Sequence, residues 1–357
     1  MWVHEKMFVL AFSQKKLSEI VAEIKAISLL PEWLLPVQNF LTEWQNPRKR
    51  VFVQQTSGST GKPKKIKLSR KHLQQSALDT IAYFHLQKND KALLCIPANF
   101  IGGKMMLVRA ILQKMDLYVV PPNIQALENI PSQLQLQFAA MIPPQVQFAL
   151  HNAREKLTNI EKIIVGGAAV THDLWEQLQS LPNTFFATYG MTETCSHIAL
   201  QQLNGANRQT HFHCMSQISV YINENDCLCI HAPLRISHDI ATNDTAILLN
   251  EKTFEICGRR DNIINSGGLK IQPEIIEKTL SKYLEAPFVV IGEKDELWGE
   301  VPILLIESEE FSVQKQQELE NFLVKKLDKK LRPKKVIFVK KLQRTANGKI
   351  IRQQYLP

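Results

Sequence analysis

The chain has 357 residues, of which 45% are hydrophobic and 22% charged, and its formal net charge is +9. This composition is typical of a globular protein and excludes a chain that is disordered throughout. The length suggests roughly two domains, and six cysteines are too few to indicate a disulfide framework.

The N-terminal segment gives no sign of targeting or of membrane insertion. Met7–Phe12 is a short apolar run that ends at Ser13–Lys16 without a small-residue cleavage pattern, so we expect no signal peptide. No apolar run approaches the roughly 20 residues that are needed to cross a bilayer. We therefore expect a cytoplasmic protein with no membrane partner.

Apolar periodicity predicts a helical lead-in over residues 1–50. Strand-like and helix-like segments then alternate, which favours a layered α/β domain with a mainly parallel sheet. In chain order we expect strand Lys91–Ile96, helix Lys104–Gln113, strands Leu117–Val120 and Phe138–Ile142, helix Pro144–His151, strand Lys162–Val165, helix Thr171–Gln179 and strand Phe185–Thr188.

The pattern changes from about Ile218 to short alternating strands, for which we expect antiparallel pairing. They are predicted at Ile218–Ile222, Leu228–His231, Ala246–Leu249 and Phe254–Cys257. A second break at Gly258–Asp261 is followed by a small α+β unit. Its expected elements are strands Ile263–Ile264 and Leu269–Ile271, helix Glu274–Leu284, strands Phe288–Ile291 and Ile303–Ile306, helix Val313–Lys330 and strand Lys335–Val339. We expect a large domain at 1–260 and a small domain at 261–357.

Basic residues crowd the segment 325–352. Such a bias can indicate nucleic acid, acidic lipid or anionic small molecules. No zinc finger and no interleaved aromatic platform accompanies it, so we expect nucleotide-type ligands and no nucleic-acid partner. One further cluster contains zinc-ligand types without zinc-site spacing, and no metal site is expected there. Its members are His211, His213, Cys214, Cys227 and Cys229.

The segment 56–65 gathers hydroxyls, glycines and lysines directly after the apolar run Val51–Val53. Glycines allow left-handed backbone and close approach to a ligand, and successive N–H groups in such a turn form an anion-binding concavity. Because Pro63 follows Gly61 and Lys62, the segment is not a Walker A loop. It predicts polyphosphate binding, with a polar hairpin between two strands as the alternative. The expected ligand-binding residues are Thr56, Ser57, Gly58, Ser59, Thr60, Gly61, Lys62 and Lys64.

Three further segments carry candidate chemistry. Thr188–Thr194 follows a predicted strand, at the place where ligands bind in α/β sheets, and offers an aromatic ring, a glycine, hydroxyls and a carboxylate. These groups suit a nucleobase, a phosphate and Mg²⁺, although the segment alone could be a turn with a solvated glutamate. Asp239–Asp244 supplies carboxylates before a strand. Arg344–Lys349 is a glycine-containing turn that presents a lysine.

The order of these motifs resembles that of the acyl-adenylate-forming superfamily, which includes acyl-CoA synthetases, adenylation domains and luciferases. The resemblance covers roughly residues 50–357. It is carried by TSGSTGKPKK at 56–65, GGAA at 166–169, YGMTE at 189–193, TND at 242–244, GRRDNIINSGGLKIQPEIIE at 258–277, WGE at 298–300 and RTANGK at 344–349. Within the superfamily, Tyr189–His197 is most similar to the o-succinylbenzoate–CoA ligase group of menaquinone synthesis.

The resemblance implies a ligase that uses ATP, Mg²⁺ and coenzyme A. The 56–65 loop would hold the β- and γ-phosphates of ATP. The implied catalytic residues are Lys349, which bridges the acid and the α-phosphate, Thr192, which touches that phosphate, and Glu193, which holds Mg²⁺. Asp244 would bind the ribose with help from Arg259. Further implied binding residues are Gly166, Gly167, Ala168, Tyr189, Gly190, Met191 and Lys270.

Asp261 matches the hinge of the superfamily, so the small domain is expected to be mobile and to present Gly267–Lys270 after rotation. The sequence also departs from the family pattern. About 55 residues precede the phosphate loop, where most members have well over a hundred, so we expect a shortened N-terminal part of the large domain. Phe100 stands where many members have a histidine in the acyl pocket, and Gln343 replaces a common proline.

The acid is the open question at this stage. A dicarboxylate such as o-succinylbenzoate needs a partner for its second carboxylate, and the candidates are Lys104, Arg109, Ser196 and His197. We expect the first two to face solvent on their helix, and a lone histidine to be structural. The alternatives are another aryl or short acyl acid, a carrier-protein thiol in place of CoA, and an inactive nucleotide-binding homologue. The sequence is compatible with a homodimer.

Overall fold

The computed structural model describes residues 2–4, 6–55, 64–344 and 350–355. It divides into two compact units. Unit one comprises residues 1–170, 177–219 and 231–239, and unit two comprises residues 171–176, 220–230 and 240–357. The expected functional division into domains at 1–260 and 261–357 stays a prediction. None of the helices in the described ranges combines the length and apolar content of a membrane span.

The strands of the main sheet in unit one are β1 (Trp2–His4), β2 (Met7–Ala11), β5 (Lys91–Leu94), β6 (Asp116–Val119), β7 (Leu136–Met141), β8 (Ile160–Val165), β9 (Thr184–Met191), β10 (Ser196–Gln202) and β11 (Phe212–Cys214). Their order is β1-β2-β6-β5-β7-β8-β9-β10-β11. The central pairs from β6 to β9 are parallel, and the pairs at both ends are antiparallel. The predicted α/β fold is confirmed, but parallel pairing is confined to the central strands from β6 to β9, so the sheet is mixed rather than mainly parallel.

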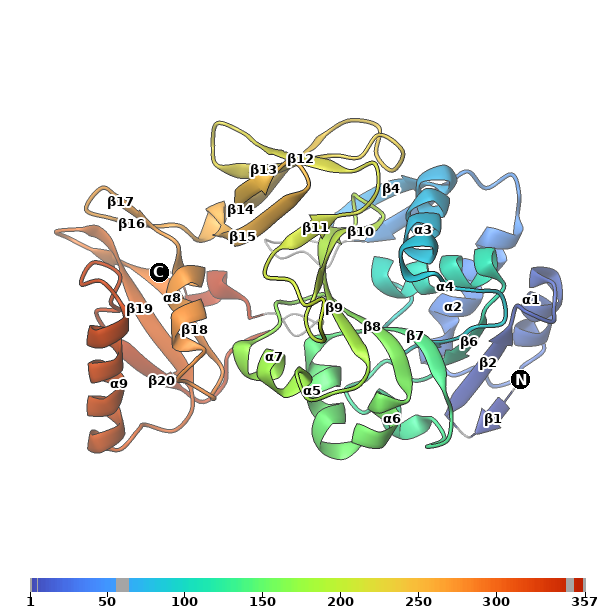
Figure 1. The fold of residues 1–357 in the computed structure, drawn as a ribbon, viewed down its shortest axis with the longest axis horizontal. Coiled ribbons are helices and arrows are strands. Elements are labelled where there is room, and N and C mark those ends of the chain that lie inside the picture. The colour runs from blue at the N-terminus through green and yellow to red at the C-terminus, as the bar shows by residue number, and fades with distance from the viewer. Residues whose placement is uncertain (1, 5, 56–63, 345–349, 356–357) are drawn as a thin grey trace. The chain divides into compact units, whose positions relative to one another are not determined.

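Helices lie on both sides of these strands (Figure 1), with α3 and α4 next to each other on one side and α5 and α6 on the other. The helical segments that precede β9 are α1 (Leu17–Lys25), η1 (Glu32–Leu34), α2 (Leu35–Gln45), α3 (Arg70–Phe84), α4 (Ile101–Gln113), η2 (Ala126–Asn129), α5 (Pro143–Asn152), α6 (Arg154–Thr158) and α7 (His172–Leu178). A separate antiparallel pair consists of β3 (Val51–Gln55) and β4 (Lys65–Ser69). This pair flanks the segment 56–63.

The expectation for residues 1–50 was correct for the helices and wrong for the first residues. Met7–Ala11 is strand β2, paired antiparallel with β6, rather than part of a helical lead-in. Met7, Phe8 and Leu10 are buried. A run of this length is too short for a stable amphipathic helix, and it fits a buried strand better.

Helix α3 shows how the sequence prepares the site. It begins after Ser69, whose Oγ accepts a hydrogen bond from His72 N at 3.1 Å, and it ends at His85 in the left-handed region with φ of 52°. Its buried face repeats at helical spacing. That face consists of Leu73, Ser76, Ala77, Thr80, Ile81 and Phe84, so two hydroxyl side chains point into the interior.

Unit two contains two sets of strands. The first has the order β15-β14-β13-β12 and consists of β12 (Ser219–Ile222), β13 (Cys227–His231), β14 (Ile240–Asn250) and β15 (Thr253–Arg259). The second has the order β17-β16-β19-β18, with β20 beside β19, and consists of β16 (Ile264–Ser266), β17 (Leu269–Ile271), β18 (Phe288–Asp295), β19 (Gly299–Glu307) and β20 (Val336–Val339). The helical segments are η3 (Arg260–Asn262), α8 (Pro273–Leu280), α9 (Val313–Lys326) and η4 (Arg352–Tyr355).

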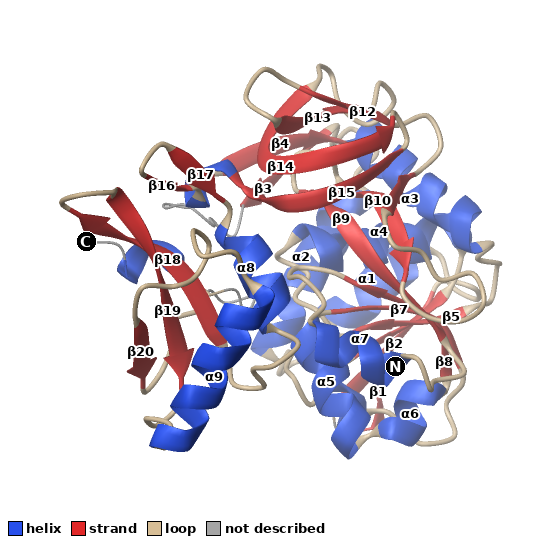
Figure 2. Ribbon diagram, turned by 60° about the vertical axis from the view of Figure 1, so that its left-hand side comes forward, coloured by secondary structure: helices blue, strands red, loops and turns tan. Residues whose placement is uncertain are grey.

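Alternate side chains of the second sheet in unit two point to opposite faces, and each face is covered by a hydrophobic cluster. Helices α8 and α9 cover one face (Figure 2), where Val290 and Leu304 pack with Leu323 of α9. Val289 and Ile303 belong to the other cluster, which the C-terminal segment completes with Leu342, Ile350 and Tyr355. The predicted α+β unit is confirmed.

Candidate active site

Part of the expected site lies outside the described residues. This applies to Thr56, Ser57, Gly58, Ser59, Thr60, Gly61 and Lys62 of the phosphate loop and to Lys349. Their flanks are described. Gln55 pairs with Lys65 across the β3–β4 ladder, and Lys64 is exposed. An isolated bridge joins Arg344 to Ile350 on either side of the C-terminal loop.

The turn after β8 holds Gly166, Gly167 and Ala168 close to β9. Gly167 has φ of 86°, which favours glycine. A Cβ on Gly166 would overlap Thr188 Oγ1, and this hydroxyl donates to Val165 O at 3.2 Å. The backbone of the turn therefore packs directly against β9, the strand that carries the next motif. A glycine backbone of this kind allows a flat ligand to approach closely.

Tyr189, Gly190 and Met191 are the last residues of β9, and β10 returns beside them as the second arm of a hairpin. Gly190 lies opposite His197. A Cβ at Gly190 would overlap Ser196 O and His197 Cα, so only glycine fits there. The Tyr189 ring is half-buried, and its centroid lies 5.9 Å from that of Phe212 on β11.

Thr192 and Glu193 lie in the turn between β9 and β10, and both are half-buried. Buried Thr194 holds this turn through Oγ1, which accepts from Met191 N at 3.1 Å and lies 2.7 Å from Ser196 O. Cys195 and Ser196 both have positive φ, of 57° and 123°. Such conformations are unfavourable for residues other than glycine and persist only where surrounding contacts impose them.

A second restraint on the turn comes from α3, where Ser76 Oγ donates to Cys195 O at 2.9 Å. The turn thus presents the Glu193 carboxylate from a constrained backbone. A single carboxylate combined with substrate phosphates is the usual way in which proteins bind Mg²⁺, so Glu193 fits that role. Sequence reasoning missed Ser76, and it included Thr194 in the candidate segment without giving it a role. A hydroxyl at each of these positions was visible, but nothing in the sequence connected α3 with the turn.

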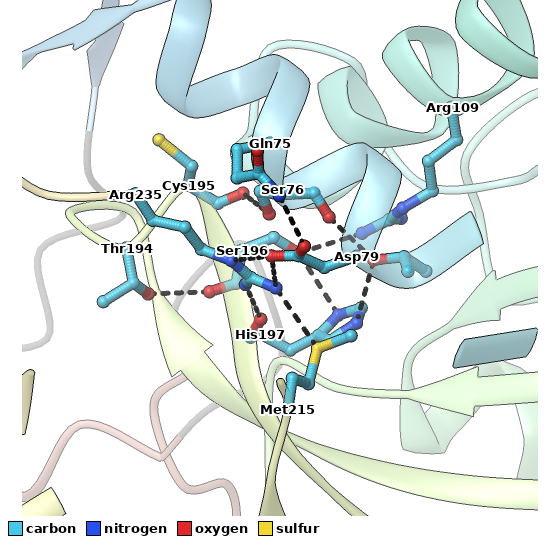
Figure 3. Close-up of polar contacts among 11 residues, drawn as sticks. Gln75, Ser76, Asp79, Arg109, Thr194, Cys195, Ser196, His197, Met215 and Arg235 are labelled. Atoms are coloured by element: carbon cyan, nitrogen blue, oxygen red, sulfur yellow. Dashed lines mark hydrogen bonds and ion pairs between the residues drawn. The ribbon is translucent and has the colours of Figure 1, made fainter. Parts of the chain in front are cut away.

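Behind the turn lies a buried polar cluster, formed by Ser76 and Asp79 of α3, Arg109 of α4, Ser196 and His197 of β10, and Arg235 (Figure 3). Thr80 of α3 also belongs to it, with Oγ1 3.2 Å from His197 Nε2. Arg235 is 1% exposed. Its Nη2 lies 2.6 Å from Asp79 Oδ2, and its Nη1 donates to His197 O at 2.6 Å. This guanidinium is thus paired with a carboxylate and fixes the position of β10.

Arg109 differs from the expectation that it would face solvent, because it is 1% exposed. Residues 105–110 of α4 are all buried, so no face of this part of the helix reaches water. Arg109 Nη2 donates to Ser196 Oγ at 3.2 Å, and Nη1 lies 3.6 Å from Met106 Sδ. Within the described residues its Nε is buried without a hydrogen-bond partner. Burial, and then the charge of Arg235, lower the pKa of Arg109 to about 9.

The other candidates for the acyl side take different positions. Lys104 is half-buried, with Nζ 5.5 Å from the centroid of the Phe40 ring, and burial lowers its pKa. Phe100 is half-buried at the start of α4. His197 is 4% exposed. Burial, together with the charges of Arg109 and Arg235, holds the pKa of His197 well below its usual value, so its imidazole is neutral at physiological pH.

Unit two brings together three of the expected residues. Asp244 and Arg259 face each other in the β14–β15 ladder, and Arg259 Nη1 lies 3.4 Å from Asp244 Oδ1. Arg259 Nη2 lies 2.7 Å from Asp261 Oδ2, which also accepts from Asn243 Nδ2 at 3.3 Å. One guanidinium therefore joins the expected ribose carboxylate to the expected hinge.

Lys270 is exposed on β17, beside a tight turn. Gly267 and Gly268 form the turn with φ of 56° and 80°. A Cβ on Gly267 would overlap the Trp298 ring, so both the backbone and the available space demand glycine at Gly267. For the cysteine and histidine cluster, no grouping of three metal-ligating side chains occurs in the described part of the chain.

Known proteins are similar to this chain in sequence and in fold. The model of the AMP-binding enzyme family matches residues 7–224, and the model of the AMP-binding enzyme C-terminal domain matches residues 286–349. A 2-succinylbenzoate–CoA ligase of Bacillus mycoides is 27% identical over 90% of this chain and 75% of its own length.

Solved structures agree with the family match. An acyl-CoA synthetase (AMP-forming)/AMP-acid ligase II-like protein from Dyadobacter fermentans is 28% identical with a TM-score of 0.64, covering 98% of both chains. An o-succinylbenzoate–CoA synthetase from Bacillus subtilis, in complex with its acyl-adenylate intermediate, is 22% identical with a TM-score of 0.74 over 85% of this chain and 68% of its own. The family model spans more than half of the residues and includes β8, β9 and the turns that follow them, so the chain belongs to the AMP-binding enzyme family.

Proposed function

We propose that the protein is an ATP-dependent ligase that joins o-succinylbenzoate to coenzyme A through an acyl-AMP intermediate. The family membership and the motif order support the ligase reaction. Relatives named 2-succinylbenzoate–CoA ligase support the choice of acid. The proposal places the reaction in the cytoplasm, where ATP and CoA are available, and assigns the basic segment 325–352 to CoA phosphates rather than to nucleic acid.

In the first half-reaction the acid carboxylate attacks the α-phosphorus of ATP, and pyrophosphate leaves. Negative charge grows on the phosphate oxygens, so preorganised donors and cations lower the barrier. Thr192 would donate to the α-phosphate, and Asp244 would accept from the ribose hydroxyls. Mg²⁺ held by Glu193 would neutralise phosphate charge when it is bound. In the second half-reaction the CoA thiol attacks the acyl carbonyl and expels AMP.

Arg109 is the observation that carries the assignment of a dicarboxylic acid. A buried guanidinium costs several kcal/mol unless an anion compensates it. Arg235 has Asp79, whereas no carboxylate in the described residues forms an ion pair with Arg109 and its Nε–H is unused. A second carboxylate on the acid, entering beside half-buried Ser196, would provide that anion. Guanidinium groups bind carboxylates in two-bond geometry.

Carboxylate-dependent ATP–pyrophosphate exchange tests this proposal. The panel contains o-succinylbenzoate, its analogue 4-oxo-4-phenylbutanoate, which lacks the ring carboxylate, benzoate and a short fatty acid, each with and without CoA. We expect exchange with o-succinylbenzoate and much weaker exchange with the analogue. Exchange with the monocarboxylic acids alone would overturn the assignment of a dicarboxylate.

Lys349 tests the ligase mechanism separately, and its role rests on the family resemblance. Lys349→Ala should abolish acyl-AMP formation and spare thioester formation from synthetic acyl-AMP and CoA, because the bridging lysine serves only the first half-reaction. Lys282→Ala, which removes an exposed lysine of unit two outside the basic segment 325–352, serves as the charge-matched control. Equal loss of both half-reactions in Lys349→Ala would contradict the split role.

A further inference from the structure

Hydrogen bonds in the buried polar cluster have a definite direction. Thr80 Oγ1 donates its single proton to Ser76 O, at 3.0 Å. Thr80 Oγ1 also lies 3.2 Å from His197 Nε2, and with its proton used it can only accept there. His197 therefore carries its proton on Nε2, since a neutral imidazole has one donor and one acceptor nitrogen.

The other side of the ring then follows. His197 Nδ1, without a proton, accepts from the Ser196 hydroxyl at 3.3 Å. Because the Ser196 proton is directed to the imidazole, Ser196 Oγ presents lone pairs to Arg109 Nη2, which donates to it at 3.2 Å. The chain of donors thus runs from Arg109 through Ser196 to His197 (Figure 3), and from His197 through Thr80 to the carbonyl of Ser76.

The alternative protonation states conflict with this arrangement. With the proton on Nδ1, Ser196 Oγ would face two donors, the imidazole and Arg109, and its own proton would lose its acceptor. An imidazolium would add a third positive charge to a buried site that already holds Arg109 and Arg235, with Asp79 as the one carboxylate among the cluster residues. Both states leave the Ser196 proton without an acceptor, whereas the Nε2-protonated form pairs every group in the chain.

We propose that His197 is a positioning residue for acid selection. As the neutral Nε2-protonated imidazole it fixes the Ser196 hydroxyl as an acceptor for Arg109, and so directs the remaining guanidinium N–H groups at the second carboxylate of the acid. This inference rests on the proposed function in taking that acid to be a dicarboxylate. The imidazole itself touches neither acid nor nucleotide.

Two amide variants separate the two nitrogens of the ring. In His197→Asn the side-chain oxygen can take the place of Nδ1 and still accept from Ser196. In His197→Gln the amide nitrogen can take the place of Nε2 and donate to Thr80, but the acceptor for Ser196 is lost. We expect His197→Asn to keep the KM for o-succinylbenzoate within about threefold of the native value, and His197→Gln to raise it about tenfold with little change in kcat.

The KM for ATP and the KM for 4-oxo-4-phenylbutanoate serve as internal controls, because neither ligand offers a second carboxylate. Both should stay unchanged in both variants. An equal rise of the KM for o-succinylbenzoate in the two variants, or a parallel rise for the analogue, would overturn the positioning role. If native protein shows no exchange with o-succinylbenzoate, the proposed function fails, and the same comparison is made with the acid that the panel identifies.

The protonation state of His197 can be read without any activity assay. In ¹⁵N-histidine-labelled native protein, we expect one imidazole with a protonated Nε2 and an unprotonated Nδ1 that does not titrate between about pH 5 and 8, unlike an ordinary histidine. Its absence from the spectrum of either His197 variant assigns it. A proton on Nδ1, or a doubly protonated ring, would overturn the inference whatever the kinetics show.

Discussion

Replacing Arg109 with methionine tests whether its buried guanidinium binds a carboxylate of the substrate. Methionine has a similar length and no charge, so the substitution removes the buried cation with little loss of volume. We expect two opposite effects: Arg109→Met should stabilise the ligand-free protein against unfolding, and it should weaken activation of a dicarboxylic acid. An arginine that is part of an ordinary structural ion pair would show only destabilisation.

The expected gain in stability follows from the pKa. Burial and the charge of Arg235 lower the pKa of Arg109 from the usual 12.5 to about 9, which corresponds to an upper bound of roughly 5 kcal/mol of penalty for the charged form. Because the folded-state pKa is depressed for a base, the whole penalty applies below pH 9 and fades as pH rises toward 12.5. Loss of the Ser196 hydrogen bond offsets about 1 kcal/mol. A net gain of about 1–4 kcal/mol remains at pH 7.

Thermal unfolding at pH 7 measures this gain, with Arg235→Met as the matched control. Arg235 is equally buried but paired with Asp79, so its removal leaves a carboxylate without a partner and should cost about 3–5 kcal/mol. For a domain of this size, each kcal/mol changes the unfolding midpoint by about 2–4 °C. The midpoints of the two variants should therefore move in opposite directions by several degrees.

A ligand adds a second measurement. Saturating o-succinylbenzoate with ATP should raise the midpoint of native protein by mass action, and the dicarboxylate should add little in Arg109→Met. The reasoning is refuted if Arg109→Met lowers the midpoint as far as Arg235→Met does, or if the acid stabilises both proteins equally.

Three further predictions concern the turn, the hairpin and unit two. Thr194→Val should reduce ATP–pyrophosphate exchange at least tenfold by releasing the Thr192–Glu193 turn, whereas Thr194→Ser should retain most of it; equal activity of the two would contradict this role. Gly190→Ala should lower the midpoint by more than Gly268→Ala, because its Cβ would overlap backbone whereas that of Gly268 meets open space; a smaller effect at Gly190 would contradict the close pairing. Burial tends to raise the pKa of Glu307, but hydrogen bonds from Arg344 and the backbone outweigh it, so the net pKa is lowered. Its stabilising contribution is therefore complete above its usual pKa of 4.5 and is lost as pH falls through the lower folded value; acid unfolding that is unchanged in Glu307→Gln would contradict it.

Periodicity predicted most elements of the fold because alternating strands and amphipathic helices leave local patterns. It missed β2 because six apolar residues carry no distinctive period. It also missed β10, because the hydroxyl-rich segment at 192–196 has the composition of a turn and hides the start of the strand. Gly190 illustrates the limit. The sequence marks it as a glycine, but only the register opposite His197 explains why no other residue fits.

Some residues of the candidate site could be predicted from the sequence, and others could not. Motif order predicts roles for Glu193, Asp244 and Arg259, because local sequence carries those motifs, and these roles stay predictions. The buried polar cluster could not be found in this manner, since its members come from α3, α4, β10 and the segment around Arg235. Arg109 was expected in water because arginine usually is. The apolar residues 105–108 and 110, which surround Arg109 on every face of the helix, were the available signal that it is not.

The position of Arg259 between two carboxylates connects the proposed roles of both. Its two terminal nitrogens contact different carboxylates, Asp244 at 3.4 Å and Asp261 at 2.7 Å. A guanidinium that moves toward one carboxylate lengthens its contact with the other. Under the proposed roles, a nucleotide that engages Asp244 would weaken or strengthen the contact between Arg259 and Asp261, and ribose binding would be coupled to hinge motion by electrostatics.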